Sequence, residues 1–373
     1  MGYERFGSYK VHECLGAGGM ASVHRATIDI GGGVEREVAL KRLLPQLAAD
    51  KKFIEDFIRE AKLAANLNHP NIVRILELGR SHGVYFIAME LVVGHSLLQL
   101  MKLAGPGRVI TPIGIVVAIF AELLDALDYA TNAVDSEGEP MQLVHRDLSP
   151  SNLIITDDGH VKIIDFGVAK GLSGKFMTNT GMVKGKLSYM ASETMSGTQL
   201  DTRADIFSIG VVMWEMITGR RLFRGQNEYE VITRIRAGAA EPPSTYNAAC
   251  TPELDEIVMH ALARDRDDRW PSAAVMRTAL GSLRRRFKHG SREVVEWKRS
   301  LVPEVHIFEE TTHMEISTRD LIADGSLRRI AQGSKPPEDE PPRFSHRVAP
   351  NEAELVITEP TGDTVVTTPF RDD

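Results

Sequence analysis

The stretch from Val144 to Gly167 constrains the fold of this chain more than any other. It reads VHRDLSPSNLIITDDGHVKIIDFG, with two β-rich runs on either side of Asp157-Asp158-Gly159. That triplet is a strong hairpin-turn signal. The predicted hairpin holds Asn152 at its entry and Asp165 at its exit, so both side chains lie at the same end. Their oxygens suit Mg²⁺, a hard cation that prefers carboxylate and phosphate oxygens.

Two spacings within this stretch give it a more specific meaning. Asn152 follows Asp147 by five residues in the order His-Arg-Asp-x-x-x-x-Asn, and Asp165 opens an Asp-Phe-Gly triplet. This is the pattern of a phosphoryl-transfer catalytic loop. A turn-rich hairpin with ordinary surface acids would explain one such motif but not the combination with its context.

Together these motifs resemble the eukaryotic-like (Hanks-type) protein kinases, and the whole resembles their bacterial serine/threonine members. The resemblance covers about residues 9 to 285. It implies an α+β, bilobal fold, with a small β-rich N-lobe (about 9–93) that carries one key helix and a larger helical C-lobe (about 94–285). Residues 1–8 are then an N-terminal extension and residues 286–373 a C-terminal one.

Composition limits the other possibilities. The net charge of −7 argues against a nucleic-acid surface. The chain has no run of about 18 apolar residues, so no membrane span is expected. Its two widely separated cysteines indicate a reducing compartment, and we expect a cytoplasmic location. From about residue 333 the chain is rich in proline and acid, which predicts disorder.

A glycine-rich stretch near the N-terminus predicts two strands joined by a turn. Gly16, Gly18 and Gly19 lie between alternating β-rich residues, and Ser22 takes the place of the third glycine of the family pattern ahead of Val23. Backbone without side chains can approach a phosphate closely and donate N–H groups to it. A plain β-turn is the alternative interpretation of these glycines taken alone.

The strand Val38-Ala39-Leu40-Lys41 follows, and a helix is predicted over about Asp50 to Asn68. The resemblance implies that Lys41 contacts the α- and β-phosphates of ATP and that Glu60 on the helix is its ion-pair partner. Glu55 is the competing candidate for that partner.

Further nucleotide contacts come from the resemblance alone. Met89 corresponds to the residue that guards the back of the adenine pocket, and Glu90 to Val92 correspond to the hinge between the lobes. The complete implied nucleotide-binding set is Leu15, Gly16, Ala17, Gly18, Gly19, Val23, Ala39, Lys41, Met89, Glu90, Val92, Asn152 and Asp165.

The resemblance also assigns the chemistry. Asp147 accepts the proton of the substrate hydroxyl, and Asn152 and Asp165 hold Mg²⁺, with Mn²⁺ as a second possibility. Arg146 indicates control by phosphorylation of the activation segment, with Thr178, Thr180 and Ser173 as candidates. In the C-lobe, Asp205 is expected to hold the backbone of the catalytic loop, and Arg269 to pair with Glu193.

Two positions depart from the serine/threonine kinase pattern. Ser149 replaces the usual lysine two residues after the catalytic aspartate, and Lys186 replaces the threonine of Gly-Thr-x-x-Tyr. In the family these side chains touch each other and the aspartate, so the charge lost at one position returns at the other. We therefore predict a catalytic role for Lys186. A solvent-facing lysine is the alternative.

The sequence leaves three functions to compare. The first is an ATP-dependent serine/threonine protein kinase that acts on protein substrates, since Ser149-Pro150-Ser151-Asn152 keeps the proline of the serine/threonine form. The second is a pseudokinase scaffold, which only Ser149 supports. The third is an adaptor that works through its tail, whose threonines could bind phosphothreonine-recognition domains once modified.

Overall fold

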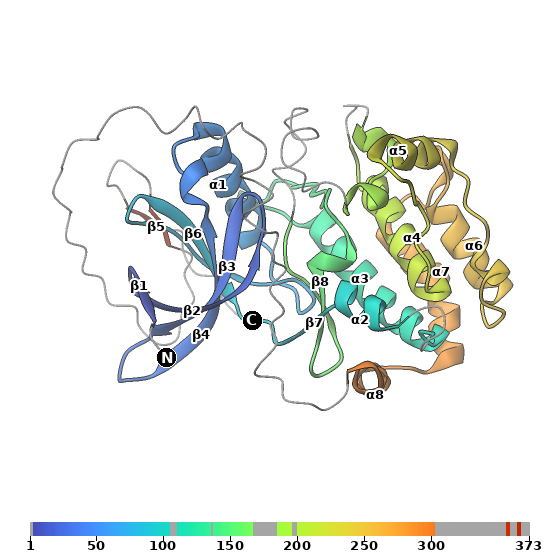
Figure 1. Ribbon diagram of the computed structural model, residues 1–373, viewed down its shortest axis with the longest axis horizontal. Coiled ribbons are helices and arrows are strands. Elements are labelled where there is room, and N and C mark those ends of the chain that lie inside the picture. Colours follow the sequence, from blue (N-terminus) through green and yellow to red (C-terminus); the bar gives the residue numbers. More distant parts are fainter. Residues whose placement is uncertain are drawn as a thin grey trace.

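The computed structural model describes residues 3–104, 110–135, 137–166, 185–195, 200–302, 356–358 and 364–366. A β-rich lobe and a helical lobe lie side by side, as Figure 1 shows from left to right, and this confirms the predicted bilobal α+β fold. The chain passes between them after β6 (Val84–Glu90) and before β7 (Gly94–Ser96). No helix in these ranges is long and apolar enough to cross a membrane.

The N-lobe is a sheet with the strand order β1-β2-β3-β4-β6-β5-β10-β11. All neighbours are antiparallel except β10 and β5. The remaining strands are β1 (Glu4–Phe6), β2 (Tyr9–Ala17), β3 (Ala21–Asp29), β4 (Glu35–Leu43), β5 (Ile75–Ser81), β10 (Val356–Thr358) and β11 (Thr364–Val366). The other residues after 302 lie outside the described ranges, so disorder from about residue 333 stays a prediction.

Helix α1 (Lys51–Ala65) is the one long helix of this lobe and lies above the sheet in Figure 1. The side chain of Asp50 caps it by accepting the N–H of Lys52, as an N-terminal aspartate should. Its apolar face buries Phe57 and Ala61 in a core cluster shared with the sheet. The predicted helix extended to Asn68, but the observed one ends at Ala65.

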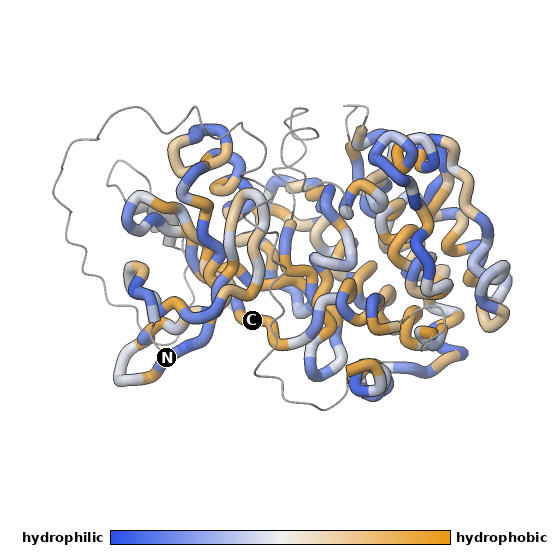
Figure 2. Tube along the Cα trace, viewed as in Figure 1, coloured by the Kyte–Doolittle hydropathy of each residue, from blue (hydrophilic) through white to orange (hydrophobic). Residues whose placement is uncertain are grey.

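The C-lobe is built around two helices that are buried along most of their length, α3 (Ile113–Asn132) and α4 (Arg203–Thr218). Gly219, at φ +66°, ends α4 in the left-handed conformation that glycine adopts most easily. In Figure 2 the outer helices show both hydrophobic and hydrophilic stretches. The other helices are α2 (Leu97–Leu103), α5 (Glu228–Ala237), α6 (Pro252–Ala261), α7 (Ala273–Phe287) and α8 (Ser291–Leu301).

The predicted hairpin lies at the junction of the lobes. Strands β8 (Leu153–Thr156) and β9 (Val161–Ile163) pair antiparallel, and β7 joins them on the other edge of β8. Gly159 occupies the turn at φ +88°, where a Cβ atom would lie 2.1 Å from the carbonyl oxygen of Ser291. The hairpin therefore packs tightly against the start of α8.

Helix α8 lies in the segment predicted as a C-terminal extension, and the sequence did not predict its contact with this hairpin. The ammonium of Lys298 donates to the carbonyl oxygen of Thr156 at 2.9 Å and pairs with the carboxylate of Asp157 at 2.5 Å. Only 7% of the Lys298 side chain is exposed. A buried lysine requires such partners, so α8 is fixed against the hairpin turn.

Candidate active site

The first turn of α4 fixes the main chain of the predicted catalytic loop. The carboxylate of Asp205 accepts the backbone N–H of His145 at 2.7 Å and of Arg146 at 2.9 Å, as expected. Arg146 is in the left-handed region at φ +65°, which costs a non-glycine residue free energy and needs such fixation. Burial raises the pKa of Asp205 to about 7, although the two N–H donors favour the carboxylate.

Asp147 and Asn152 are fixed to each other at the centre of the loop. The amide nitrogen of Asn152 donates to the main-chain oxygen of Asp147 at 2.9 Å and to its Oδ2 at 3.0 Å. Both residues are buried, with 5% exposure each. The amide nitrogen of Asn152 thus orients the carboxylate of Asp147.

Lys186 reaches this pair from the activation segment. Its ammonium lies 2.7 Å from Oδ2 of Asp147 and 3.2 Å from Oδ1 of Asn152. Ser149, by contrast, bonds through its hydroxyl to that of Ser151 at 2.9 Å. Lys186 therefore turns toward Asp147, although 30% of its side chain is exposed, and its catalytic role stays a prediction.

On the nucleotide side, Lys41 joins two carboxylates. Its ammonium is 2.5 Å from Oε1 of Glu60 and 2.8 Å from Oδ1 of Asp165. Glu55, the competing candidate, is exposed and lies 3.9 Å from Lys51 on the same helix. The N–H of Ile164 donates to the carbonyl oxygen of Asn152 at 3.0 Å, which brings Asp165 beside the catalytic loop.

The charges of this triad are unequal, because one ammonium serves two carboxylates. Burial alone would lower the pKa of Lys41, but the negative charges of Asp165 and Glu60 outweigh it and raise the pKa. Burial raises the pKa of Glu60, Lys41 opposes this, and the charge of Asp165 adds to it. A second cation near Asp165 would relieve this excess of negative charge.

The oxygens of Asn152 and Asp165 are a donor set that fits a divalent cation. Among the described residues no group of three or more histidine, cysteine, aspartate or glutamate side chains could hold a metal ion. Mg²⁺ is usually bound by only one or two carboxylates together with phosphate oxygens and water, so a small oxygen set agrees with it.

The structure places the predicted nucleotide-binding residues along the strands that face this triad. Gly16 pairs with Val23 across β2 and β3, and a Cβ atom at Gly16 would meet nothing within 4 Å. Ala39 and Met89 are opposite each other on β4 and β6 and are buried. Leu15, Ala17, Gly18, Gly19 and Val92 lie on the adjoining strand, turn and hinge.

Glu90 has a contact that the sequence did not predict. Its carboxylate accepts the ammonium of Lys162 on β9 at 2.6 Å and the N–H of Arg74 at 3.0 Å. The hinge is therefore tied by an ion pair to the hairpin that carries Asn152 and Asp165. The two residues lie 72 positions apart, so no local pattern could have indicated the pair.

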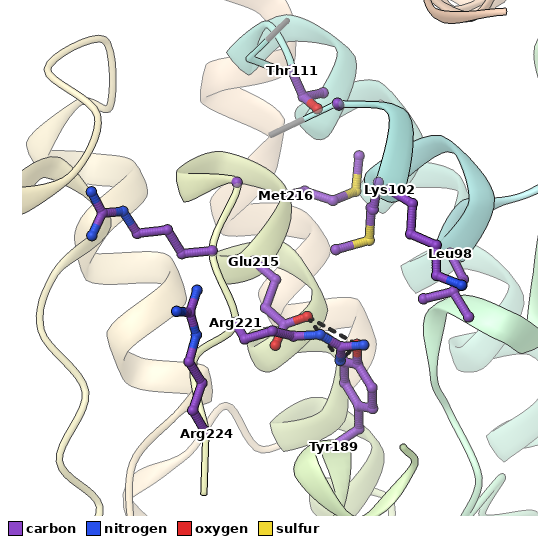
Figure 3. Close-up of a pocket in the computed structure, with 12 residues that line it drawn as sticks. Leu98, Lys102, Thr111, Tyr189, Glu215, Met216, Arg221 and Arg224 are labelled. Atoms are coloured by element: carbon purple, nitrogen blue, oxygen red, sulfur yellow. Dashed lines mark hydrogen bonds and ion pairs between the residues drawn. The ribbon is translucent and has the colours of Figure 1, made fainter. Parts of the chain in front are cut away.

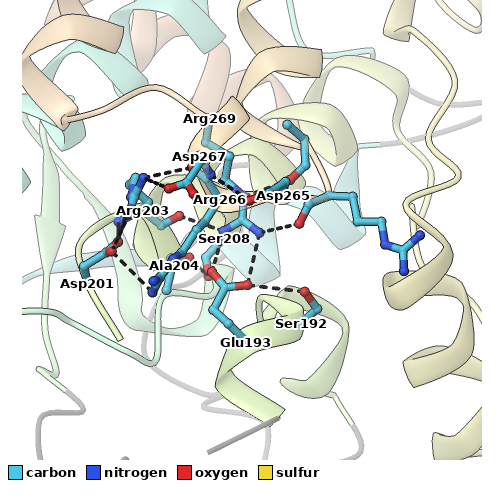
Figure 4. Close-up of polar contacts among 12 residues, drawn as sticks. Ser192, Glu193, Asp201, Arg203, Ala204, Ser208, Asp265, Arg266, Asp267 and Arg269 are labelled. Atoms are coloured by element: carbon cyan, nitrogen blue, oxygen red, sulfur yellow. Dashed lines mark hydrogen bonds and ion pairs between the residues drawn. The ribbon is translucent and has the colours of Figure 1, made fainter. Parts of the chain in front are cut away.

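The end of the activation segment is anchored as predicted. Arg269 donates to both carboxylate oxygens of Glu193, at 2.6 and 3.1 Å, and to three main-chain oxygens. Figure 4 shows Glu193 and Arg269 at the centre of this network, with Ser192 beside the carboxylate. Such two-pronged arginine–carboxylate pairs are geometrically specific, and the serine at position 192 leaves this one intact.

Three regulatory candidates, Ser173, Thr178 and Thr180, lie outside the described residues. Arg146 is described, and its Nε is buried without a hydrogen-bond partner in that part of the chain. The proposed pairing of Arg146 with a phosphorylated segment therefore stays a prediction.

Comparison with known proteins agrees with this geometry. Residues 9–280 match the family model described as "Protein kinase domain". A protein named tyrosine-protein kinase MasK, from Myxococcus xanthus, is 39% identical over 77% of this chain and 44% of its own length. Serine/threonine-protein kinase PrkC from Bacillus subtilis is 34% identical over 72% of this chain and 39% of its own length.

The fold has a similar counterpart among solved structures. The kinase domain of PknI from Mycobacterium tuberculosis aligns with a TM-score of 0.56 and 28% identity, covering 76% of this chain and 98% of that domain. The chain spans less than half the length of the curated relatives it matches.

Proposed function

This chain belongs to the protein kinase family, and from that premise we propose that it is an active enzyme that transfers the γ-phosphate of ATP to hydroxyl groups of proteins. The supporting observation is that the ion triad of Lys41, Glu60 and Asp165 lies next to the linked pair of Asp147 and Asn152. A scaffold without activity would not need both groups in one site. We assign residues 9–285 to the catalytic unit.

Each residue has a role that follows from its contacts. Lys41 binds and orients the phosphates, and Glu60 holds its ammonium in place. Asp147 accepts the proton of the acceptor hydroxyl as that oxygen attacks. Asn152 and Asp165 would hold Mg²⁺, or Mn²⁺ in its place. When bound, the cation neutralises charge on the phosphate oxygens.

We assign Lys186 to the same reaction. Its ammonium approaches Asp147 and Asn152 at the place where the γ-phosphate must pass to the hydroxyl. A preorganised cation at this point stabilises charge that develops in the transition state. Lys186 therefore supplies, from the activation segment, the charge that Ser149 lacks.

For the acceptor we propose serine and threonine, on the basis of the Ser149-Pro150-Ser151-Asn152 segment. Tyrosine is the second candidate, because one relative at 39% identity is named a tyrosine-protein kinase. Phosphoamino-acid analysis of a mixed protein substrate separates the two, since phosphotyrosine as the main product would refute the serine/threonine assignment.

We also propose that phosphorylation at Thr178, Thr180 or Ser173 orders the activation segment against Arg146. Phosphate adds a charge of about −1.5 to −2 and pairs well with arginine. Threonines of the C-terminal extension, once modified, would present phosphothreonine to recognition domains of partner proteins. Mass spectrometry of the active protein should find phosphate in the segment, and an active preparation without any would count against this regulation.

The test of activity is phosphate transfer from labelled ATP to a generic basic protein, with and without Mg²⁺. We expect Mg²⁺-dependent labelling of protein by the wild type and almost none by Asp147→Asn. Binding of nucleotide without transfer by the wild type would instead identify a pseudokinase.

A further inference from the structure

A basic pocket lies between α2 and the C-terminal end of α4. It has a volume of about 160 Å³, and its polar lining consists mainly of Lys102, Tyr189, Glu215, Arg220, Arg221 and Arg224. Figure 3 shows Lys102 and Leu98 on α2 facing Glu215 and the loop that carries Arg221 and Arg224. The loop returns toward α2 because Gly219 turns the chain at the end of α4.

The only carboxylate in the lining of this pocket is already satisfied. Glu215 accepts the hydroxyl of Tyr189 at 2.9 Å and the N–H of Leu222 at 3.1 Å, and the guanidinium of Arg221 lies 3.5 Å away. Arg221 also donates to the hydroxyl of Tyr189. Burial raises the pKa of Glu215, with Arg221 opposing this. One arginine and two neutral donors therefore contact this carboxylate, and the charge of Arg224 also favours its ionised form.

The remaining lining cations give the pocket an excess of positive charge. Three arginine side chains alone line it against one carboxylate. Arg220 lies 4.8 Å above the ring of Tyr246, and neither Arg220 nor Arg224 has an ion-pair partner within the described ranges. Such a concentration of charge is notable in a chain with a net charge of −7 and favours an anionic ligand.

The pocket wall is connected to the active site through one short turn of the chain. Its wall residue Tyr189 ends the 3-10 helix that Lys186 precedes, and the N–H of Tyr189 donates to the carbonyl oxygen of Lys186 at 3.0 Å. Lys186 in turn contacts Asp147. An extended peptide advances about 3.3 Å per residue. When the acceptor hydroxyl of a substrate lies at Asp147, a side chain within roughly four residues of it can extend toward the pocket.

We propose that this pocket binds an anionic side chain of the protein substrate, so that the enzyme prefers acceptor hydroxyls with an acidic residue close by in the sequence. The anionic group is a carboxylate or a phosphate already on the substrate, since arginine binds both in the same two-pronged way. The inference rests on the proposed kinase function and adds the substrate class to it.

The test compares peptides that differ in one side chain. Each peptide carries one acceptor hydroxyl and a glutamate, a phosphoserine or a glutamine at positions from four before to four after it. We expect kcat/KM for the best acidic position to exceed that of its glutamine counterpart by about fivefold or more. Arg224→Gln should bring the ratio close to one, whereas Arg236→Gln, an exposed arginine of α5, should leave the ratio as in the wild type.

Charge reversal makes the test more stringent. Arg224→Glu should favour a lysine peptide over the glutamate peptide at the same position, an inversion that loss of stability alone cannot produce. Equal ratios in wild type, Arg224→Gln and Arg236→Gln, with transfer intact, would overturn the pocket assignment but leave the kinase function standing.

A binding measurement keeps the two proposals separate. Fluorescence anisotropy of a fluorescein-labelled glutamate peptide should show tighter binding to the wild type than to Arg224→Gln, and inorganic phosphate should compete. If no peptide is phosphorylated, the proposed function fails while the anisotropy still decides the pocket. Equal binding of the glutamate and glutamine peptides would overturn the pocket in either case.

Discussion

Two lysines, Lys41 and Lys186, occupy comparable positions on opposite sides of the active site. Each ammonium joins two side chains, Glu60 and Asp165 in the first case and Asp147 and Asn152 in the second. Lys41 lies within a nine-residue strand that pairs on both sides. Lys186 directly precedes a three-residue 3-10 helix and has no strand to hold it.

Their partners also differ in origin. Glu60 comes from the N-lobe and Asp165 from the hairpin exit, so Lys41 connects elements of both lobes. Asp147 and Asn152 belong to one loop, so Lys186 connects that loop to the activation segment. Side-chain exposure follows the same order, at 14% for Lys41 and 30% for Lys186. The nucleotide side is thus fixed by the sheet, while the charge at the acceptor side depends on the placement of the activation segment.

The largest predicted effect tests whether both sides are essential. Lys41→Met removes the phosphate contact and Asp147→Asn the proton acceptor, and each should lower kcat/KM by about three orders of magnitude or more. Single-turnover transfer of labelled phosphate to a protein substrate measures the loss. Transfer near the wild-type rate in either variant would remove the corresponding residue from the site.

A smaller effect is predicted for Lys186→Thr, which restores the residue usual in the family. It should lower kcat by about tenfold to a hundredfold, the range for one charged contact to a transition state, with little change in KM for ATP. Lys62→Met, an exposed lysine on α1, is the control for loss of a positive charge. A rise in KM for ATP at constant kcat would place Lys186 in ground-state binding instead.

The double variant Ser149→Lys with Lys186→Thr sharpens the comparison further. It returns the cation to the catalytic loop and should recover part of the loss, roughly threefold to tenfold in kcat over Lys186→Thr. Ser149→Lys alone should bring no gain, because two ammonium groups would compete for one carboxylate. If the double variant shows only the product of the two single losses, the two positions do not exchange a charge.

The sequence predicted the parts of this site that depend on local patterns. The turn Asp157-Asp158-Gly159 and its flanking β-rich runs specified the hairpin, and the spacing of Asp147 and Asn152 specified the loop between them. The contact of Lys186 with Asp147 was predicted only through the known family geometry, because 39 residues separate them. Its catalytic role is still a prediction.

Other contacts could not be predicted from the sequence, because they bury a residue that is usually exposed or join segments that lie far apart in the chain. Lysine is mostly exposed on helices, so the amphipathic pattern of α8 gave no indication that Lys298 is buried against Thr156. The bond between Tyr189 and Glu215 and the pair of Glu90 with Lys162 likewise join distant segments. Only packing in three dimensions brings these groups together.

The smallest predicted effect concerns stability and follows from the unequal charges around Lys41. Burial raises the pKa of Glu60 above its unfolded value of about 4.3, and Lys41 opposes that rise. At pH values between the unfolded and the folded pKa of Glu60, the folded state therefore binds more protons than the unfolded state. The free energy of unfolding falls as the pH rises through this window and stops falling once the folded pKa is passed. In Lys41→Met the charge that opposes this rise is lost, so the pKa of Glu60 should be higher still. The free energy of unfolding should then keep falling to a higher pH than in the wild type.

Thermal unfolding between pH 6 and pH 9 measures this difference. A contribution of about 1 kcal/mol corresponds to roughly 2–4 °C in Tm for a domain of this size, so Tm of Lys41→Met should drop by about that much more than Tm of the wild type. Ionisation of Lys41 itself does not interfere, because its pKa is raised above this range. Lys62→Met, which changes an exposed lysine on the same helix as Glu60, should follow the wild-type profile. Parallel profiles for all three proteins would show that Lys41 does not control the charge of Glu60, and the two lysines would then differ only in their contacts with the reacting groups.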